Sequence, residues 1–162
     1  MSLEIHLELR KTLAEAHGQL IQMDATAAIT PPAPGKWSPI EIIGHLIDSA
    51  SNNHSRFVVA NFQDSLIFPG YQQEHWVTVQ QYREADWVAI ITLWTSFNHH
   101  LAHVMEHTPQ DVLHDPRERH DFASMTHGYI DDENPNSLYH LMKDYVAHVR
   151  HHLKQIEGLE LS

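Results

Sequence analysis

The chain contains no cysteine, and this absence removes several kinds of chemistry at once. It excludes disulfides, zinc sites built from cysteine and a cysteine nucleophile. Any metal site in this protein must therefore draw its ligands from His, Asp or Glu.

Long apolar runs and an excess of positive charge are absent too. No stretch approaches the roughly 20 apolar residues that a membrane-spanning helix needs, and the N-terminal MSLEIHLELRK lacks the apolar core of a signal peptide. The chain has 10 Lys and Arg against 21 Asp and Glu, a formal net charge of -11, and its positive residues are scattered. We therefore expect a cytoplasmic protein that binds neither membranes nor nucleic acid.

Apolar residues recur at helical spacing in four long segments, residues 3–24, 38–62, 85–107 and 137–158. Ser38, Pro39 and Glu41 form a strong helix-start signal, and Asn136 or Ser137 caps the last helix. We expect one short helix within residues 63–85 and a long loop at 108–136. With no convincing strand, the sequence predicts an all-α four-helix bundle, and at 162 residues a single domain spanning 1–162.

Histidine is the most over-represented residue type, at 16 of 162 residues. On the last helix, His148 and His152 are spaced i, i+4, so both rings can reach one metal ion. The apolar face of this helix includes His152 and has His148 at its edge, whereas His140 and His151 point outward. Asp144, one turn earlier, is placed to orient the His148 ring by a hydrogen bond. The alternative is a pair of hydrogen-bonded core histidines without metal.

A third ligand must come from another helix, and periodicity alone does not choose it. The apolar stripe of residues 38–62 favours His54 or leaves His45 and His54 undecided. His45 lies on a polar stripe with Asn52 and Arg56, which suits the wall of a cleft.

A further set of histidines, His99, His103 and His107, is spaced i, i+4, i+8, with His100 beside it. These residues lie on the side of their helix opposite its apolar face, so we expect them to face solvent and to bind metal only weakly.

Two segments, KWSPIEIIGHLIDS (residues 36–49) and DYVAHVRHHLKQI (residues 144–156), resemble signature segments of the DinB-like, YfiT-like superfamily. The resemblance covers most of the chain and implies an up-down-down-up bundle holding a divalent metal through three histidines. Carried onto this sequence, the implied ligands are His45, His148 and His152, and His54 drops out. Ala147 departs from the family, whose members often carry an aromatic residue there.

Three neutral imidazoles leave coordination positions open, as in catalytic rather than structural metal sites. Zinc or nickel fits such a site, with iron, manganese or copper also accepted by imidazole. Relatives look like thiol S-transferases and isomerases that use bacillithiol, mycothiol or glutathione, and others are described as metal-dependent hydrolases. The resemblance also implies a homodimer.

These observations lead to three functional hypotheses. The first is a metal-dependent transferase in which a low-molecular-weight thiol attacks a small-molecule substrate, the reactive group being a metal-bound thiolate. The second is a hydrolase that uses metal-bound water, with Asp48 and Asp144 as the acids nearest the ligands in sequence. The third is a stress-associated metal-binding protein without turnover. Tyr71 and Trp76 are candidates for the pocket wall, and Asn52 for a supporting position.

Overall fold

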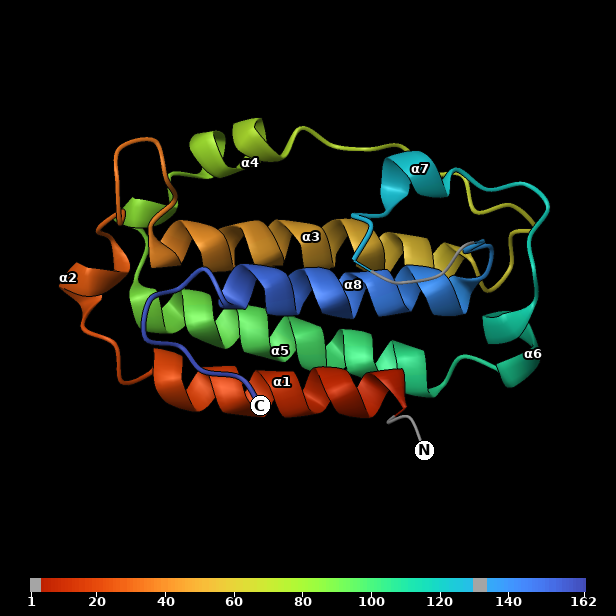
Figure 1. The fold of residues 1–162 in the computed structure, drawn as a ribbon, viewed down its shortest axis with the longest axis horizontal. Helices are drawn as coiled ribbons and strands as arrows, with labels where there is room; N and C mark the ends of the chain where they lie inside the picture. Colours follow the sequence, from red (N-terminus) through yellow and green to blue (C-terminus); the bar gives the residue numbers. More distant parts are fainter. Residues whose placement is uncertain (1–3, 130–133) are drawn as a thin grey trace.

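Four long helices form the body of the protein (Figure 1). The computed structural model describes residues 4–129 and 134–162, and within them the regular secondary structure is helical, apart from one isolated bridge between Leu66 and His120. The long helices are α1 (Ile5–Leu20), α3 (Pro39–Val59), α5 (Trp87–Glu106) and α8 (Leu138–Leu153). The predicted all-α four-helix bundle is confirmed.

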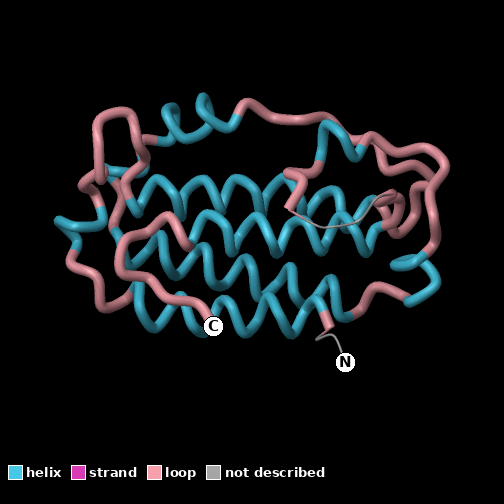
Figure 2. The backbone as a smooth tube through the Cα atoms, in the orientation of Figure 1, coloured by secondary structure: helices cyan, strands magenta, loops and turns pink. Residues whose placement is uncertain are grey.

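Short helices occupy the connections between the long ones (Figure 2). They are α2 (Ala25–Ala28), α4 (Gln73–Gln80), the 3-10 helix η1 (Tyr82–Glu84), α6 (Gln110–His114) and α7 (Phe122–Met125). The segment at 108–136, predicted as one long loop, thus contains α6 and α7, and its residues 130–133 lie outside the described part. Within the described ranges no helix is long and apolar enough to cross a membrane.

The long helices run up, down, down and up in chain order (Figure 1). Helices α3 and α5 are therefore parallel neighbours, and α1 and α8 are the other parallel pair. Each of α1 and α3 packs against both α5 and α8. Because α3 and α5 run in the same direction, the chain must return along the whole bundle between them, and the segment containing α4 makes this return (Figure 1).

The predicted start of α3 at Ser38 or Pro39 is confirmed, and its cap explains it. The Ser38 backbone N–H donates to Glu41 Oε2 at 2.8 Å, the Ser38 side chain accepts from the N3 backbone N–H, and Pro39 occupies the first turn. This capping box satisfies helix N–H groups that would otherwise lack partners. It fixes where α3 begins, and hence on which side of the helix His45 projects.

The predicted helix ends were less accurate than the starts. Helix α1 ends at Leu20 rather than Asp24, and its predicted start at Leu3 lies outside the described residues. Helix α8 ends at Leu153 rather than near Gly158, because the chain then tightens into turns such as Ile156 N–H to Leu153 O at 3.1 Å. Tightening of this kind satisfies the last carbonyl groups of a helix and ends its regular periodicity.

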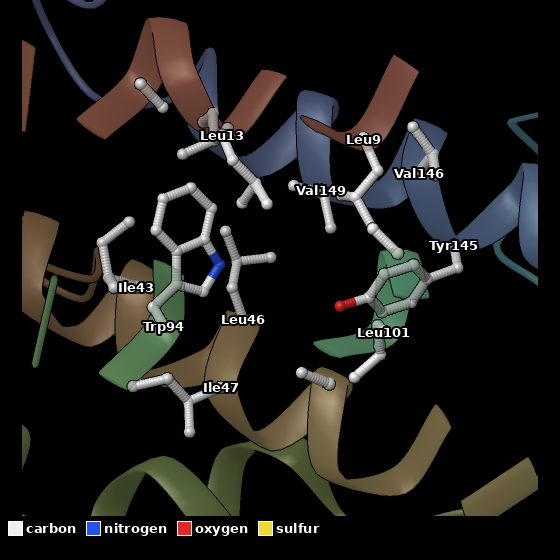
Figure 3. Packing of buried hydrophobic residues seen from close by; sticks show 14 of the residues in the cluster. Leu9, Leu13, Ile43, Leu46, Ile47, Trp94, Leu101, Tyr145, Val146 and Val149 are labelled. Atoms are coloured by element: carbon white, nitrogen blue, oxygen red, sulfur yellow. The ribbon is translucent and has the colours of Figure 1, made fainter. Parts of the chain in front are cut away.

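The core is built from all four long helices, as Figure 3 shows around Trp94. Trp94, Leu46 and Leu101 are fully buried. Burying a large apolar side chain stabilises the fold by roughly 1.5–3 kcal/mol, so this layer holds the helices in register. The labelled core residues are Leu9, Leu13, Ile43, Leu46, Ile47, Trp94, Leu101, Tyr145, Val146 and Val149.

Gly44 lets the returning segment approach α3 closely. A Cβ atom at this position would lie 2.2 Å from Cδ2 of Tyr82, a contact that real side chains do not make. The Tyr82 ring therefore packs directly on the α3 backbone, one residue before His45. A glycine inside a helix costs about 1 kcal/mol relative to alanine, and here the close packing explains it.

Candidate metal centre

Three histidines from two helices converge on one point between α3 and α8. His45 of α3 and His148 of α8 bring their Nε2 atoms to 3.3 Å, and a potential ligand nitrogen of His152 completes a set lying within 4.8 Å of one another. Two nitrogens bound to one tetrahedral zinc ion at about 2.0–2.1 Å are about 3.4 Å apart. The His45–His148 pair is thus already at the separation that a shared ion requires. Only the His152 nitrogen would have to move closer to complete the site.

The chain places two of the rings in the interior and one at its edge. His45 and His148 are 0% and 1% exposed, whereas His152 is half-buried. The prediction that His152 lies inside the apolar face with His148 at its edge was therefore wrong, because His148 is the more buried of the two. The His127 ring, from the segment before α8, stacks on His148 at 3.8 Å between centroids and covers it, a contact that the periodicity of one helix cannot predict.

Burial keeps these imidazoles neutral. It lowers the pKa of His45 to about 3, with smaller effects from His152 and His127. The pKa of His148 is held far below its usual range by burial and by the neighbouring histidines, and that of His152 is also lowered by burial. Neutral imidazole has a free lone pair, which is the form that binds a metal ion.

Among the three rings, His152 is the one whose Nδ1 has a hydrogen-bond partner in the described chain. His152 donates its Nδ1–H to Gln155 Oε1 at 2.8 Å, which leaves Nε2 free as a ligand. The Nδ1 atoms of His45 and His148 are buried and have no hydrogen-bond partner among the described residues.

Aromatic stacking orients the other two rings. The Trp37 ring lies 4.9 Å from the His45 ring between centroids, and the His127 ring stacks on His148 at 3.8 Å with an interplanar angle of 13°. Tyr129 extends this stack from His127 to His151. Ring packing therefore orients His45 and His148, as the hydrogen bond to Gln155 orients His152.

Asp144 does not orient His148, contrary to the prediction. Its carboxylate is buried and accepts backbone N–H groups instead, from His127 at 2.9 Å and from Tyr129 at 3.4 Å. Asp144 therefore anchors the segment before α8 against the helix. This anchoring places the His127 ring on His148, so Asp144 acts on the cluster through the loop.

Asp48 is likewise engaged away from the histidines. Its Oδ1 accepts from Tyr82 Oη and from Gln80 Nε2, each at 2.7 Å, while Oδ2 is buried without a partner among the described residues. Burial raises the pKa of this carboxyl group, partly offset by the two hydrogen bonds. Asn52, the predicted supporting residue, donates to the Asp48 backbone carbonyl at 2.9 Å.

Tyr71 and Trp76 form a pair of rings with centroids 5.3 Å apart. In the described residues neither makes a ring contact with the three histidines; Tyr71 instead lies near Ser49 and Arg56 on α3. Their role as pocket walls stays a prediction. Trp37, which does contact His45, lies in the start signal of α3, but the sequence contained no sign that it would fold back over the ring.

The remaining candidate histidines lie elsewhere. His54 is half-buried and contacts Phe97 and His100, with ring centroids 5.6 and 5.1 Å away. The predicted exposure of His99 and His103 on α5, and of His107 directly after its last residue, is confirmed. His103 and His107, with Glu106, form a second group of potential metal ligands on the surface.

The comparisons with known proteins concern the family and the fold. A family model described as the DinB superfamily matches residues 8–156. Among solved structures the chain is similar to YfiT from Bacillus subtilis, described as a probable metal-dependent hydrolase with an unusual four-helix bundle topology. The TM-score is 0.77 at 18% sequence identity, over 96% of this chain and 83% of that one, so the likeness shows the fold. No curated protein matches the chain.

Proposed function

The chain belongs to the DinB superfamily, and from this premise we propose that it is a divalent-metal-dependent enzyme whose ion is held by His45, His148 and His152. The observation that carries the proposal is the 3.3 Å approach of two neutral, buried Nε2 atoms from different helices. A pair of core histidines sharing one hydrogen bond would leave the third ring beside them unexplained. Three imidazoles suit zinc or nickel, with iron or manganese as alternatives.

Three protein ligands leave coordination positions for a small molecule. A divalent ion in such a site lowers the pKa of a bound thiol or water, so that a nucleophile forms at neutral pH. The protein's own residues supply the rest of the site: Trp37 and His127 hold two ligand rings, and Gln155 holds the third in the tautomer that ligates.

For the reaction, we propose transfer of a low-molecular-weight thiol, of the bacillithiol, mycothiol or glutathione type, to an electrophilic small molecule. The chain has no cysteine, so the sulfur nucleophile must come from a second molecule. Hydrolysis needs a base beside the attacking water. The two buried acids of this region are occupied elsewhere, Asp48 by Tyr82 and Gln80 and Asp144 by backbone N–H groups, which favours the thiol.

Metal-dependent hydrolysis at the same site is the second candidate. It is supported by the description of YfiT, the structural neighbour, as a probable metal-dependent hydrolase. Asp48, whose Oδ2 has no partner in the described chain, is the carboxylate that would act as base after a change in its surroundings.

The proposal is tested first by elemental analysis of the purified protein and then by turnover of electrophilic and ester substrates, each with and without added thiol. We expect about one equivalent of divalent metal per chain and thiol-dependent turnover, both lost in His152→Ala. Turnover that is equal without thiol would favour the hydrolase. Full metal content without turnover of either substrate class would indicate a metal-binding protein, and a His152→Ala protein with full metal and activity would end the site assignment.

A further inference from the structure

Arg56 is a buried cation on the same side of α3 as His45. It is 6% exposed. It follows His45 by eleven residues, about three helical turns, which brings it back to nearly the same angular position about 16 Å further along the axis. The helix therefore presents a potential metal ligand and a guanidinium group along one face.

The guanidinium of Arg56 has almost none of the partners that burial demands. Nη2 donates to the Pro69 carbonyl oxygen at 3.0 Å, and no carboxylate lies within ion-pair distance among the described residues. Burial lowers the pKa of Arg56, yet arginine stays protonated in proteins. A buried charge without a counterion is costly, and proteins retain one where something else neutralises it.

Arg117 shows what a structural arginine looks like in this same protein. It is similarly buried, at 8% exposed, but it donates to three backbone carbonyl oxygens and its Nε lies 3.7 Å from Asp115 Oδ2. Its contacts join the segment that follows α3 to the segment around α6. Arg56 performs no comparable structural task.

The unpartnered N–H groups of Arg56 remain open to solvent, because none of its nitrogens is among the fully enclosed unpartnered atoms of the described chain. The guanidinium also lies near His127, a ring that borders the histidine cluster. His127, whose ring stacks on His148, is close enough for the Arg56 charge to lower its pKa, behind the larger effects of burial and Asp144. Tyr71 lies beside Arg56 and Ser49.

The buried acids nearby do not neutralise Arg56. Asp144 accepts the N–H groups of His127 and Tyr129, and Asp48 is bonded to Tyr82 and Gln80 with its pKa raised by burial. The charge is therefore available to an anion that enters from solvent.

We propose that Arg56 binds a carboxylate group of the small molecule that reacts at the His45, His148 and His152 cluster, so that the protein selects thiols or substrates that are acids. This inference rests on the proposed function. A planar guanidinium matches a carboxylate bidentately, and such charge-assisted bonds are short and strong. The positions of Arg56 and the cluster would then fix the distance between the carboxylate and the reacting atom, and this distance sets the length of molecule that fits.

The test uses unbranched mercaptoalkanoic acids of increasing chain length, together with their methyl esters, titrated into the zinc-loaded protein by calorimetry. We expect acids to bind more tightly than esters, with an optimum length at which sulfur reaches the cluster while the carboxylate reaches Arg56. Arg56→Gln should remove the acid preference and the optimum, an effect of about 10- to 100-fold at the best length. Its zinc content should stay unchanged. Arg56→Lys, which keeps the charge but not the bidentate geometry, should fall between the two.

Arg119→Gln is the matched control, since this arginine is exposed and makes no side-chain hydrogen bond or ion pair in the described chain. It should keep the wild-type length profile. Equal binding of acids and esters by the wild type, or an unchanged preference in both Arg56 variants, would overturn the inference.

Succinate and succinamide separate this inference from the proposed function. They carry no thiol, so their binding to the metal-free protein reports on Arg56 alone. Succinate binding that is lost in Arg56→Gln, in a protein that takes up no zinc when zinc is added, would refute the metal site and retain the anion site. Zinc binding by a protein that does not prefer succinate over succinamide would refute the anion site and retain the metal site. The carboxylate recognised by Arg56 could belong to the thiol or to the electrophile. The two cases are distinguished by testing which of the two compounds loses affinity when its carboxylate is converted to an ester.

Discussion

The pairs His148/His152 on α8 and His103/His107 on α5 share a four-residue spacing, yet the bundle gives them different surroundings. Both belong to groups whose potential ligand atoms lie within 4.8 Å of one another. In the first group the third residue comes from another helix and two rings are buried. In the second, the third residue is Glu106 of the same helix, all three side chains are exposed, and the carboxylate is paired with Arg10 at 2.9 Å.

The difference shows that burial and partner helix, rather than spacing, make a metal site. Rings held by packing lose little conformational entropy when a metal binds, whereas exposed side chains must be ordered at that moment. A carboxylate already paired with arginine must also give up part of that interaction. We therefore expect tight binding at the buried cluster and weak binding at the exposed one.

The largest effect should come from His148→Ala. Removing a buried ligand leaves two rings, and we expect zinc affinity to fall at least about 100-fold, since losing even a supporting hydrogen bond costs up to that much. Competition with a chromophoric chelator measures it. His151→Ala, an exposed neighbour on α8, should leave the affinity unchanged. Retention of wild-type affinity by His148→Ala would remove the distinction between the clusters.

Acidification should destabilise the metal-free protein through the buried cluster. The unfolded chain takes up protons at His45 and His148 below about pH 6.5, whereas in the folded chain burial lowers the pKa of His45 to about 3 and that of His148 further still. Stability is therefore fully present above about pH 6.5 and is lost as the pH falls below it. Each histidine contributes a slope of about 1.4 kcal/mol per pH unit.

Urea unfolding of chelator-treated protein, at several pH values from about 7.5 down to 5, measures this slope. The double variant His45→Gln, His148→Gln should flatten it by about 3 kcal/mol per pH unit, if it folds. His103→Ala, His107→Ala should keep the wild-type slope. An identical slope in all three proteins would show that the buried rings are not the cause.

Gly44→Ala tests how the packing of α3 supports the buried cluster. The new methyl group would overlap the Tyr82 ring, so the returning segment must shift next to His45. We expect a loss of stability of about 1–3 kcal/mol from overpacking, reduced by up to about 1 kcal/mol of gained helix propensity. Thermal unfolding measures the change.

Gly18→Ala in α1 is the control for this substitution, because no atom lies within 4 Å of the added Cβ. It should stabilise the protein slightly, by up to about 1 kcal/mol. If both variants changed stability in the same direction, the contact between Tyr82 and Gly44 would not be important for the fold.

The smallest effect should come from His103→Ala with His107→Ala. Their removal should eliminate only weak metal binding, seen at excess zinc, and change the free energy of unfolding by no more than about 0.5 kcal/mol, as is usual for exposed positions. Metal titration and urea unfolding check the two parts. A large loss of bound metal at one equivalent would place the tight site on α5.

The helices and their starts were predictable from the sequence because capping and periodicity are local. Ser38 with Glu41 marked the start of α3, and the apolar phase of α8 turned His151 outward. The site was only partly predictable. The position of the apolar face on α8 singled out His148 and His152. On α3, periodicity favoured His54 or left His45 and His54 undecided, and the family resemblance was needed to choose. Trp37 and His127 were missed because their contacts join segments distant in the chain.

By itself the sequence determined that any metal must be held by histidine or a carboxylate and that the fold is helical. It also determined that two of the many histidines lie one helical turn apart on the inward-facing side of the last helix. These properties depend on residue type and on neighbours within a few positions. The tertiary structure decided which histidine of α3 meets that pair and which of the rings are buried. It also decided which backbone N–H groups the Asp144 carboxylate accepts, and that Arg56 is buried without a counterion. Each of these depends on packing between helices, which brings together residues about a hundred positions apart.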